Sequence, residues 1–173
     1  MAKSDIKQIL FSRKTIENRI KWLARKLTKD YKGKNPILIC ILKGSFVFLS
    51  ELLKNMPIPL TIDFVQVGSY GKRKIPGKLK FKKDIDCKIS GRHVLIIEDI
   101  IDTGKTLKFI IKTLKKRGPK SVKICSLLDK PSRRKVKVPL DYLGFTVPNK
   151  FIVGYGIDYN EKYRNLPYIA TVD

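Results

Sequence analysis

Residues 94–107 read VLIIEDIIDTGKTL, and this stretch decides the fold. It opens with an uninterrupted apolar run of strand length, which is typical of a strand covered on both faces. Glu98 and Asp99 end that run, and Asp102 follows just before Thr-Gly-Lys-Thr. A turn between a strand and a helix N-terminus presents backbone N–H groups to an anion, and the helix dipole adds to the attraction. The stretch therefore predicts an anion site beside a group of carboxylates.

Strands and helices alternate on both sides of this stretch. A continuous apolar run predicts a strand over 37–42, strand-like patterns are found over 61–67 and 121–129, and two shorter strands are expected at YLGF and FIVGYG. Helices are expected over 13–31, over 45–55 and from the turn up to Gly118. This alternation favours an α/β fold in which right-handed crossovers build a mainly parallel central sheet flanked by helices. Its ligand crevice is expected beyond the carboxyl ends of the strands.

The length of 173 residues suits one domain with one substantial core, so residues 1–173 are taken as a single unit. No apolar run approaches the roughly 20 residues of a membrane span, and a membrane partner is not expected. The N-terminus lacks the pattern of a secretory signal. Cys40, Cys87 and Cys125 form no Cys-x-x-Cys pair, which indicates reduced thiols in a cytoplasmic protein rather than a structural zinc site.

The chain carries a formal charge of +23, with 38 Lys and Arg against 15 Asp and Glu. Dense positive charge is the electrostatic signature of a nucleic-acid binder. It also suits a small anionic substrate that is steered by the field of the protein. A third interpretation is compositional drift, because the lysines are scattered along the chain. Charge alone does not select among these three.

The turn first suggests a nucleotide-triphosphate loop. Gly104-Lys105-Thr106 matches the end of the G-x-x-x-x-G-K-[ST] motif. That motif requires glycine at position 99, where this chain has Asp99. A P-loop is therefore excluded.

The whole of 94–107 instead resembles the phosphoribosyl-diphosphate (PRPP) motif of the type I phosphoribosyltransferases. LKGSFVF at 42–48 resembles their diphosphate loop, in which the peptide before the lysine is commonly cis. DFVQVGSYG at 63–71 resembles the start of their mobile lid. Residues 127–169, with the run Asp-Lys-Pro-Ser-Arg-Arg, are similar to the C-terminal segment of the bacterial hypoxanthine-guanine enzymes. The resemblance covers nearly the whole chain.

This resemblance implies an architecture and a reaction. The architecture is the type I phosphoribosyltransferase fold with a mobile lid at about 69–83 and a purine-binding hood formed by about 130–173 and the N-terminal residues. The reaction is purine salvage, in which PRPP and hypoxanthine or guanine give a nucleotide and diphosphate. Mg²⁺ is the implied cofactor, since PRPP carries dense negative charge and Mg²⁺ is held by one or two carboxylates plus substrate oxygens. A homodimer or homotetramer is usual in the family.

The resemblance also assigns roles within the motif. Asp102 is the general base that takes a proton from the purine ring. Glu98 and Asp99 hold the ribose hydroxyls, directly or through magnesium. The cradle of the 5′-phosphate comprises Thr103, Gly104, Lys105 and Thr106, with Lys105 contributing its backbone amide.

The resemblance places the diphosphate on Lys43, Gly44 and Arg164, and it places Ser69 and Tyr70 in the lid. A guanidinium suits a diphosphate because it can bind bidentately, although an isolated arginine near a C-terminus is usually just solvated.

The purine site is implied to lie on four residues. Lys130 donates to the 6-oxo group, Phe151 stacks on the ring, and Ile152 and Asp158 reach its edge, with Asp158 also near the metal. Taken alone, Phe151 is interpreted as a core aromatic residue.

The competing hypothesis is a regulatory or nucleic-acid-binding protein that uses the same fold with weak catalysis. Such a relative could keep the phosphate turn and lose the catalytic set. Here Asp102, Lys43, Lys130 and Arg164 are all present, which favours an enzyme acting on small molecules, and nucleic acid is not an expected partner.

Overall fold

The computed structural model describes residues 6–70 and 78–172. Its strands are β1 (Ile6–Phe11), β2 (Ile37–Ile41), β3 (Thr61–Tyr70), β4 (Lys78–Lys83), β5 (His93–Ile101), β6 (Ser121–Asp129), β7 (Tyr142–Thr146), β8 (Phe151–Val153) and β9 (Ile169–Val172). Its helices are α1 (Arg13–Tyr31), α2 (Phe46–Lys54) and α3 (Lys105–Lys115), with a short 3-10 turn at Pro131–Arg133. None of the helices in this described part is long and apolar enough to cross a membrane.

The central sheet has six strands in the order β4-β3-β2-β5-β6-β7. β3, β2, β5, β6 and β7 run parallel to one another, and β4 pairs with β3 in the antiparallel direction. The expected mainly parallel sheet with flanking helices is therefore confirmed. The strand predicted over 121–129 and the helix predicted over 13–31 have the observed bounds of β6 and α1.

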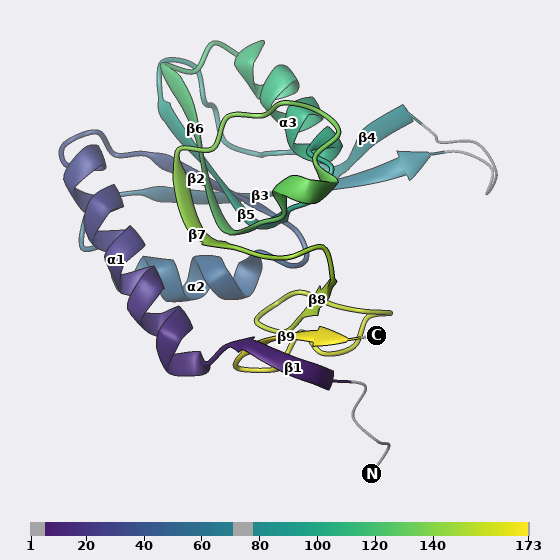
Figure 1. Cartoon of the computed structure of the whole chain (residues 1–173). Helices are drawn as coiled ribbons and strands as arrows, with labels where there is room; N and C mark the ends of the chain where they lie inside the picture. Colours follow the sequence, from purple (N-terminus) through teal and green to yellow (C-terminus); the bar gives the residue numbers. More distant parts are fainter. Residues whose placement is uncertain (1–5, 71–77, 173) are drawn as a thin grey trace.

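Both faces of the sheet are covered, which explains the continuous apolar runs of its strands (Figure 1). Along β2, Leu38 and Cys40 belong to the core shared with α1 and α2. Ile37, Ile39 and Ile41 belong to the core shared with α3 on the opposite face. Because successive side chains of a strand point to opposite faces, a strand buried on both sides needs apolar residues at every position.

Helix α1 begins where the sequence indicates. The Oγ atom of Ser12 accepts a hydrogen bond from the backbone N–H of Thr15 at 3.2 Å, which caps the helix. A cap of this kind stabilises a helix by about 1 kcal/mol. The stripe at helical spacing is fully buried against the sheet, and it consists of Ile16, Ile20, Leu23 and Leu27.

A separate antiparallel sheet, ordered β1-β9-β8, joins the N-terminal and C-terminal segments (Figure 1). The purine-binding hood is predicted to be formed by these same N-terminal and C-terminal segments. Neither β1 nor β9 was predicted, because each is short and the two pair with each other across almost the whole length of the chain. Long-range pairing of this kind leaves little local signal.

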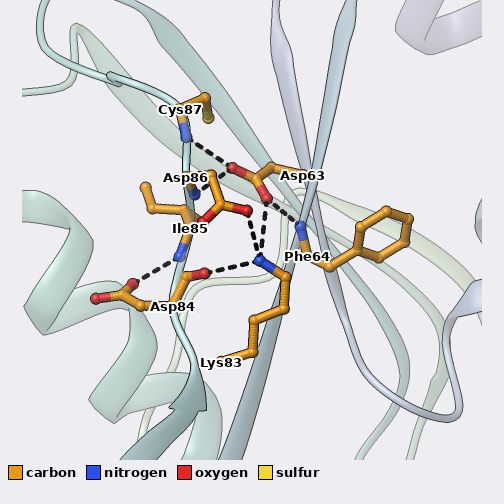
Figure 2. Close-up of polar contacts among 7 residues, drawn as sticks. All are labelled: Asp63, Phe64, Lys83, Asp84, Ile85, Asp86 and Cys87. Atoms are coloured by element: carbon orange, nitrogen blue, oxygen red, sulfur yellow. Dashed lines mark hydrogen bonds and ion pairs between the residues drawn. The ribbon is translucent and has the colours of Figure 1, made fainter.

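β3 and β4 form an antiparallel arm that projects from the edge of the sheet (Figure 1). The predicted lid, 69–83, covers the end of β3 and all of β4, and its residues 71–77 lie outside the described residues. At the base of the arm, Asp63 accepts hydrogen bonds from the backbone N–H groups of Phe64, Asp86 and Cys87 at 2.7, 2.8 and 2.9 Å (Figure 2). This buried carboxylate ties the segment after β4 to β3.

Candidate active site

The site lies where the order of the strands reverses. From β2 the chain passes through α2 to β3 on one side, whereas β5 lies on the other side of β2. The loops that follow β2 and β5 therefore diverge and leave a crevice beyond the carboxyl ends of the two strands. Residues 42–45 enter this crevice from β2, and residues 102–104 enter it from β5.

The loop after β2 packs directly on the acids at the end of β5. The Leu42–Lys43 peptide bond is cis, in agreement with what the resemblance to the phosphoribosyltransferases implies. A Cβ atom at position 44 would lie 1.5 Å from Oδ2 of Asp99, so only glycine fits there. On its other side, the carbonyl oxygen of Gly44 would lie 2.1 Å from a Cβ atom at Gly156. Gly44 thus joins the loop after β2 to β5 and to the C-terminal segment.

Glu98 and Asp99 form a pair of carboxyl groups in contact at the end of β5. Burial, together with the neighbouring charge of Asp99, holds the pKa of Glu98 well above its ordinary value. Burial also raises the pKa of Asp99, against the opposing effects of its hydrogen bonds and of the Arg164 guanidinium. Two carboxyl groups withdrawn from water in this way favour a proton, a cation or hydroxyl donors between them.

The turn that follows β5 lines a pocket of about 210 Å³. The lining comprises residues 100–104 with Ile41, Glu98, Thr106 and Leu107. Gly104 is the N-cap residue of α3, where it has no side chain to accept a hydrogen bond, and its φ of +79° lies in the left-handed region that favours glycine. The N–H of Lys105 makes only a long hydrogen bond, 3.4 Å, to Oγ1 of Thr103. The first turn of α3 therefore presents backbone donors to the pocket, as an anion site requires.

Asp102 stands at the mouth of this pocket with 41% of its side chain exposed. Its Oδ1 atom lies 3.3 Å from Nε of Arg133. Arg134 holds the backbone beneath it, because Nε of Arg134 donates to the carbonyl oxygen of Asp102 at 3.0 Å. Arg134 also pairs with Asp129 at the end of β6. Neither Arg133 nor Arg134 was predicted to act at the site, although both belong to the Asp-Lys-Pro-Ser-Arg-Arg run.

Lys130 follows β6 and has a buried side chain, only 8% of the residue being exposed. Its Nζ atom donates to the carbonyl oxygen of Lys150 at 2.7 Å, and burial lowers its pKa. Phe151 is the next residue after Lys150, and it is 63% exposed beside Tyr159, with ring centroids 5.8 Å apart. The interpretation of Phe151 as a core residue is therefore wrong. Ile152 does pack in the core, with only 6% of the residue exposed.

Lys43 and Arg164 meet through a residue that the sequence analysis left without a role. Glu161 Oε2 lies 3.1 Å from Nζ of Lys43 and 3.3 Å from Nη2 of Arg164. Arg164 also binds Oδ1 of Asp158 at 2.7 Å and the carbonyl oxygen of Gly156 at 2.9 Å. The structure thus brings together two cations that are distant in the sequence.

The predicted magnesium ligands divide into two groups. Glu98 and Asp99 are adjacent, whereas Asp158 pairs with Arg164. Within residues 6–70 and 78–172, no cluster of three or more His, Cys, Asp or Glu side chains is arranged to hold a metal. The donor set fits Mg²⁺ bound by one or two carboxylates with substrate oxygens completing the shell, and it does not form an all-protein cage. For the lid pair, the backbone of Ser69 and Tyr70 ends β3, and their side chains lie outside what the structure describes.

Comparison with known proteins gives a consistent result. Residues 8–160 match the family model described as a phosphoribosyl transferase domain. The chain is 50% identical over 173 residues to a hypoxanthine-guanine phosphoribosyltransferase of Streptococcus thermophilus, covering 99% of this chain and 96% of the relative. It is 51% identical over 173 residues to the enzyme of the same name from Streptococcus pneumoniae, with the same coverage. A solved hypoxanthine phosphoribosyltransferase of Staphylococcus aureus superposes with a TM-score of 0.93 at 46% identity, covering 98% of this chain and 92% of that one.

Proposed function

The chain belongs to the phosphoribosyltransferase family, and we propose that it is a purine-salvage enzyme. In this proposal it transfers the 5-phosphoribosyl group of PRPP to hypoxanthine and guanine and releases diphosphate. One observation carries the proposal: Asp102 and the turn after it line a single pocket at the carboxyl end of β5. The relatives that share about half of its residues over the full chain bear names that state this activity.

Asp102 is the proposed general base. One ring nitrogen of the purine gives its proton to the carboxylate while the other attacks the anomeric carbon of PRPP. The bond from that carbon to the diphosphate oxygen breaks, and diphosphate leaves with the bonding electrons. Because Asp102 is partly exposed at the mouth of the pocket, its carboxylate is accessible to the purine. A positioned base of this kind contributes about 10²–10⁴-fold to the rate.

Glu98 and Asp99 are proposed to bind the two ribose hydroxyls. The transition state has oxocarbenium character at the anomeric carbon, as in other glycosyl transfers. Carboxylates near the ring accept the hydroxyl protons in hydrogen bonds and favour the developing positive charge. The 5′-phosphate is bound by residues 103–106, whose backbone N–H groups begin α3.

Mg²⁺ is the proposed cofactor. Glu98 and Asp99 are the residues that would hold it together with PRPP oxygens, with Asp158 close to the diphosphate end of the site. When bound, the ion neutralises the charge of PRPP and of the leaving diphosphate. Lys43, Gly44 and Arg164 bind the diphosphate alongside it.

Lys130 is proposed to select the purine. An ammonium group has three donors, and one of them is used by the carbonyl oxygen of Lys150. A remaining donor can bind the 6-oxo group of hypoxanthine or guanine. In adenine it would face the 6-amino group, which is itself a donor, so adenine is disfavoured. Phe151 stacks on the ring, and its exposure leaves a face free for that contact.

The assay incubates the protein with PRPP, Mg²⁺ and hypoxanthine and measures inosine monophosphate. Asp102→Asn should lose about 10²–10⁴-fold in kcat. Asp86→Asn, which changes an 86%-exposed carboxylate, is the matched control and should keep full activity. Absence of product with every 6-oxopurine, or full activity in Asp102→Asn, would contradict the proposal. Steeply salt-dependent retention of RNA or DNA without nucleotide synthesis would favour the regulatory alternative.

We also propose that the enzyme works in the cytoplasm as a homodimer or homotetramer. The free thiols of Cys40, Cys87 and Cys125 are typical of a reducing compartment. A largely apolar groove lies between α2 and β3, and it is lined in part by the exposed side chains of Phe46 and Ile62. This groove offers a surface for a second copy of the chain. Sedimentation analysis of the wild type and of Phe46→Ser tests the assembly.

A further inference from the structure

Glu161 lies between the two cations that are assigned to the diphosphate. We propose that the Glu161 carboxylate takes the position of a diphosphate oxygen whenever no diphosphate group is bound, so that Glu161 competes with PRPP and diphosphate and sets their affinity. This inference rests on the proposed function, because it takes Lys43 and Arg164 as diphosphate ligands.

The first argument is the geometry of the bridge. A single oxygen of Glu161, Oε2, lies 3.1 Å from Nζ of Lys43 and 3.3 Å from Nη2 of Arg164. Carboxylate and phosphate oxygens make the same charge-assisted hydrogen bonds with lysine and arginine. The spacing of the two cations is therefore already that of a site for one bridging anionic oxygen.

The second argument is the difference in how the three side chains are held. Arg164 is only 21% exposed and keeps its bonds to Asp158 and Gly156 if Glu161 leaves. The side chains of Glu161 and Lys43 are 66% and 55% exposed, so Glu161 can rotate into water without uncovering a core. The guanidinium stays in place while the carboxylate is exchangeable.

The third argument concerns the backbone. The N–H of Glu161 donates to Oδ2 of Asp158 at 2.9 Å, and Tyr159 pairs with Lys162 across the same turn. Asn160 and Glu161 have φ values of +51° and +60°, in the left-handed region. This fixed turn directs the Glu161 side chain toward Lys43. Displacement of the carboxylate then requires a side-chain rotation and leaves the turn unchanged.

The consequence of this competition is a lower affinity for diphosphate and a faster release of the diphosphate product. Hydrogen bonds from Lys43 and then from Arg164 hold the pKa of Glu161 below its ordinary value, so the competitor is anionic at neutral pH. PRPP has to displace it, and its return helps to expel the diphosphate product. Because exposed ion pairs are individually weak, the loss of both should tighten diphosphate binding by about threefold to tenfold.

The test is calorimetric titration of inorganic diphosphate, with Mg²⁺, into the wild type, Glu161→Gln and Asp86→Asn. The control removes one carboxylate from an exposed ion pair with Lys83, away from the diphosphate ligands. Glu161→Gln should lower the Kd by about threefold to tenfold, and Asp86→Asn should leave it unchanged. In steady state the KM for PRPP should fall in parallel while the KM for hypoxanthine stays constant.

An unchanged Kd in Glu161→Gln would overturn the inference. A raised Kd would overturn it as well, because it would mean that Glu161 positions the two cations for the ligand. Failure of the proposed function is distinguishable, since the calorimetric result does not depend on turnover. A wild type that makes no nucleotide, paired with tighter diphosphate binding in Glu161→Gln, would contradict only the reaction.

Discussion

Gly44 packs so closely on Asp99 that a Cβ atom at position 44 would lie 1.5 Å from the Asp99 Oδ2 atom. The contact joins two neighbouring parallel strands at the point where their loops diverge. It couples the loop assigned to diphosphate to the acid assigned to the ribose. A change on either side of this contact is therefore expected to disturb both halves of the proposed PRPP site.

Gly44→Ala should lower the catalytic rate strongly while lowering the free energy of unfolding only moderately. The new methyl group forces Asp99 or the loop to shift, which costs about 1–3 kcal/mol of stability as overpacking does. Misplacement of site groups by about 1 Å can cost about 10²-fold in rate. Steady-state kinetics and urea denaturation measure the two effects. Gly68→Ala is the control, because there the new methyl group meets mainly the movable side chain of Lys82. Equal loss of activity in both variants would contradict the argument.

Glu98→Gln should stabilise the fold at neutral pH while lowering activity. Burial and then Asp99 raise the pKa of Glu98 in the folded protein. The unfolded chain releases this proton near pH 4.5, so ionisation disfavours the folded state increasingly from that pH upward to the folded pKa. Glutamine removes this cost, and we expect a gain of about 1–2 kcal/mol at pH 7 that disappears below about pH 4.

Denaturation of the wild type and Glu98→Gln at pH 4 and pH 7 measures the difference. If Glu98→Gln were less stable than the wild type at pH 7, the prediction would be wrong, because the interactions of the native carboxylate would then outweigh the cost of burying its charge.

Asp63→Asn should destabilise the protein at pH 7 by about 1–3 kcal/mol. One oxygen of Asp63 accepts from Phe64 and the other accepts from Asp86 and Cys87 (Figure 2). Asparagine has only one acceptor oxygen, so its amide N–H groups would face backbone donors. Asp86→Asn is the control, because it changes only an exposed pair with Lys83 and should alter stability by less than about 1 kcal/mol.

The same carboxylate gives a pH dependence of known sign. Burial opposes ionisation of Asp63, but the hydrogen bonds from Cys87, Phe64 and Asp86 outweigh it and lower the pKa. The stabilisation is therefore complete above the unfolded pKa of about 3.9 and is lost as pH falls through the lower folded pKa. Acid titration of the unfolding free energy should show this loss in the wild type, and the Asp63→Asn curve should lack it.

Local pattern was enough to predict the five parallel strands of the central sheet and the turn between β5 and α3. β5, the turn at 102–106 and α3 are contiguous in the sequence, so the residue pattern of each segment is enough to predict its secondary structure. Strands β1 and β9 escaped prediction because they are short and pair with each other from opposite ends of the chain. Glu161 was missed for the same reason, since its partner Lys43 is 118 positions away. Contacts of this kind depend on the folded topology, which no window of sequence contains.

Lys130→Met should change which purines react while leaving the fold intact. Burial lowers the pKa of Lys130, so the buried positive charge disfavours the folded state, and methionine fills a similar volume without that charge. Loss of the donor to the 6-oxo group should lower kcat/KM for hypoxanthine and guanine by about 10²-fold or more, because a site built to hydrogen-bond a substrate depends on that bond. Adenine makes no use of the donor and should lose little, so the ratio of the two rates should move toward adenine.

Lys150→Met is the matched control for this substitution. Lys150 receives the hydrogen bond from Lys130 on its backbone carbonyl oxygen, and its own side chain is exposed. The substitution therefore keeps the acceptor that orients Lys130 and removes the same charge nearby. If Lys150→Met and Lys130→Met lowered kcat/KM for hypoxanthine equally, the effect would come from the general field of the site. A loss confined to Lys130→Met, with unchanged thermal stability, assigns the recognition of the 6-oxo group to the Lys130 ammonium itself.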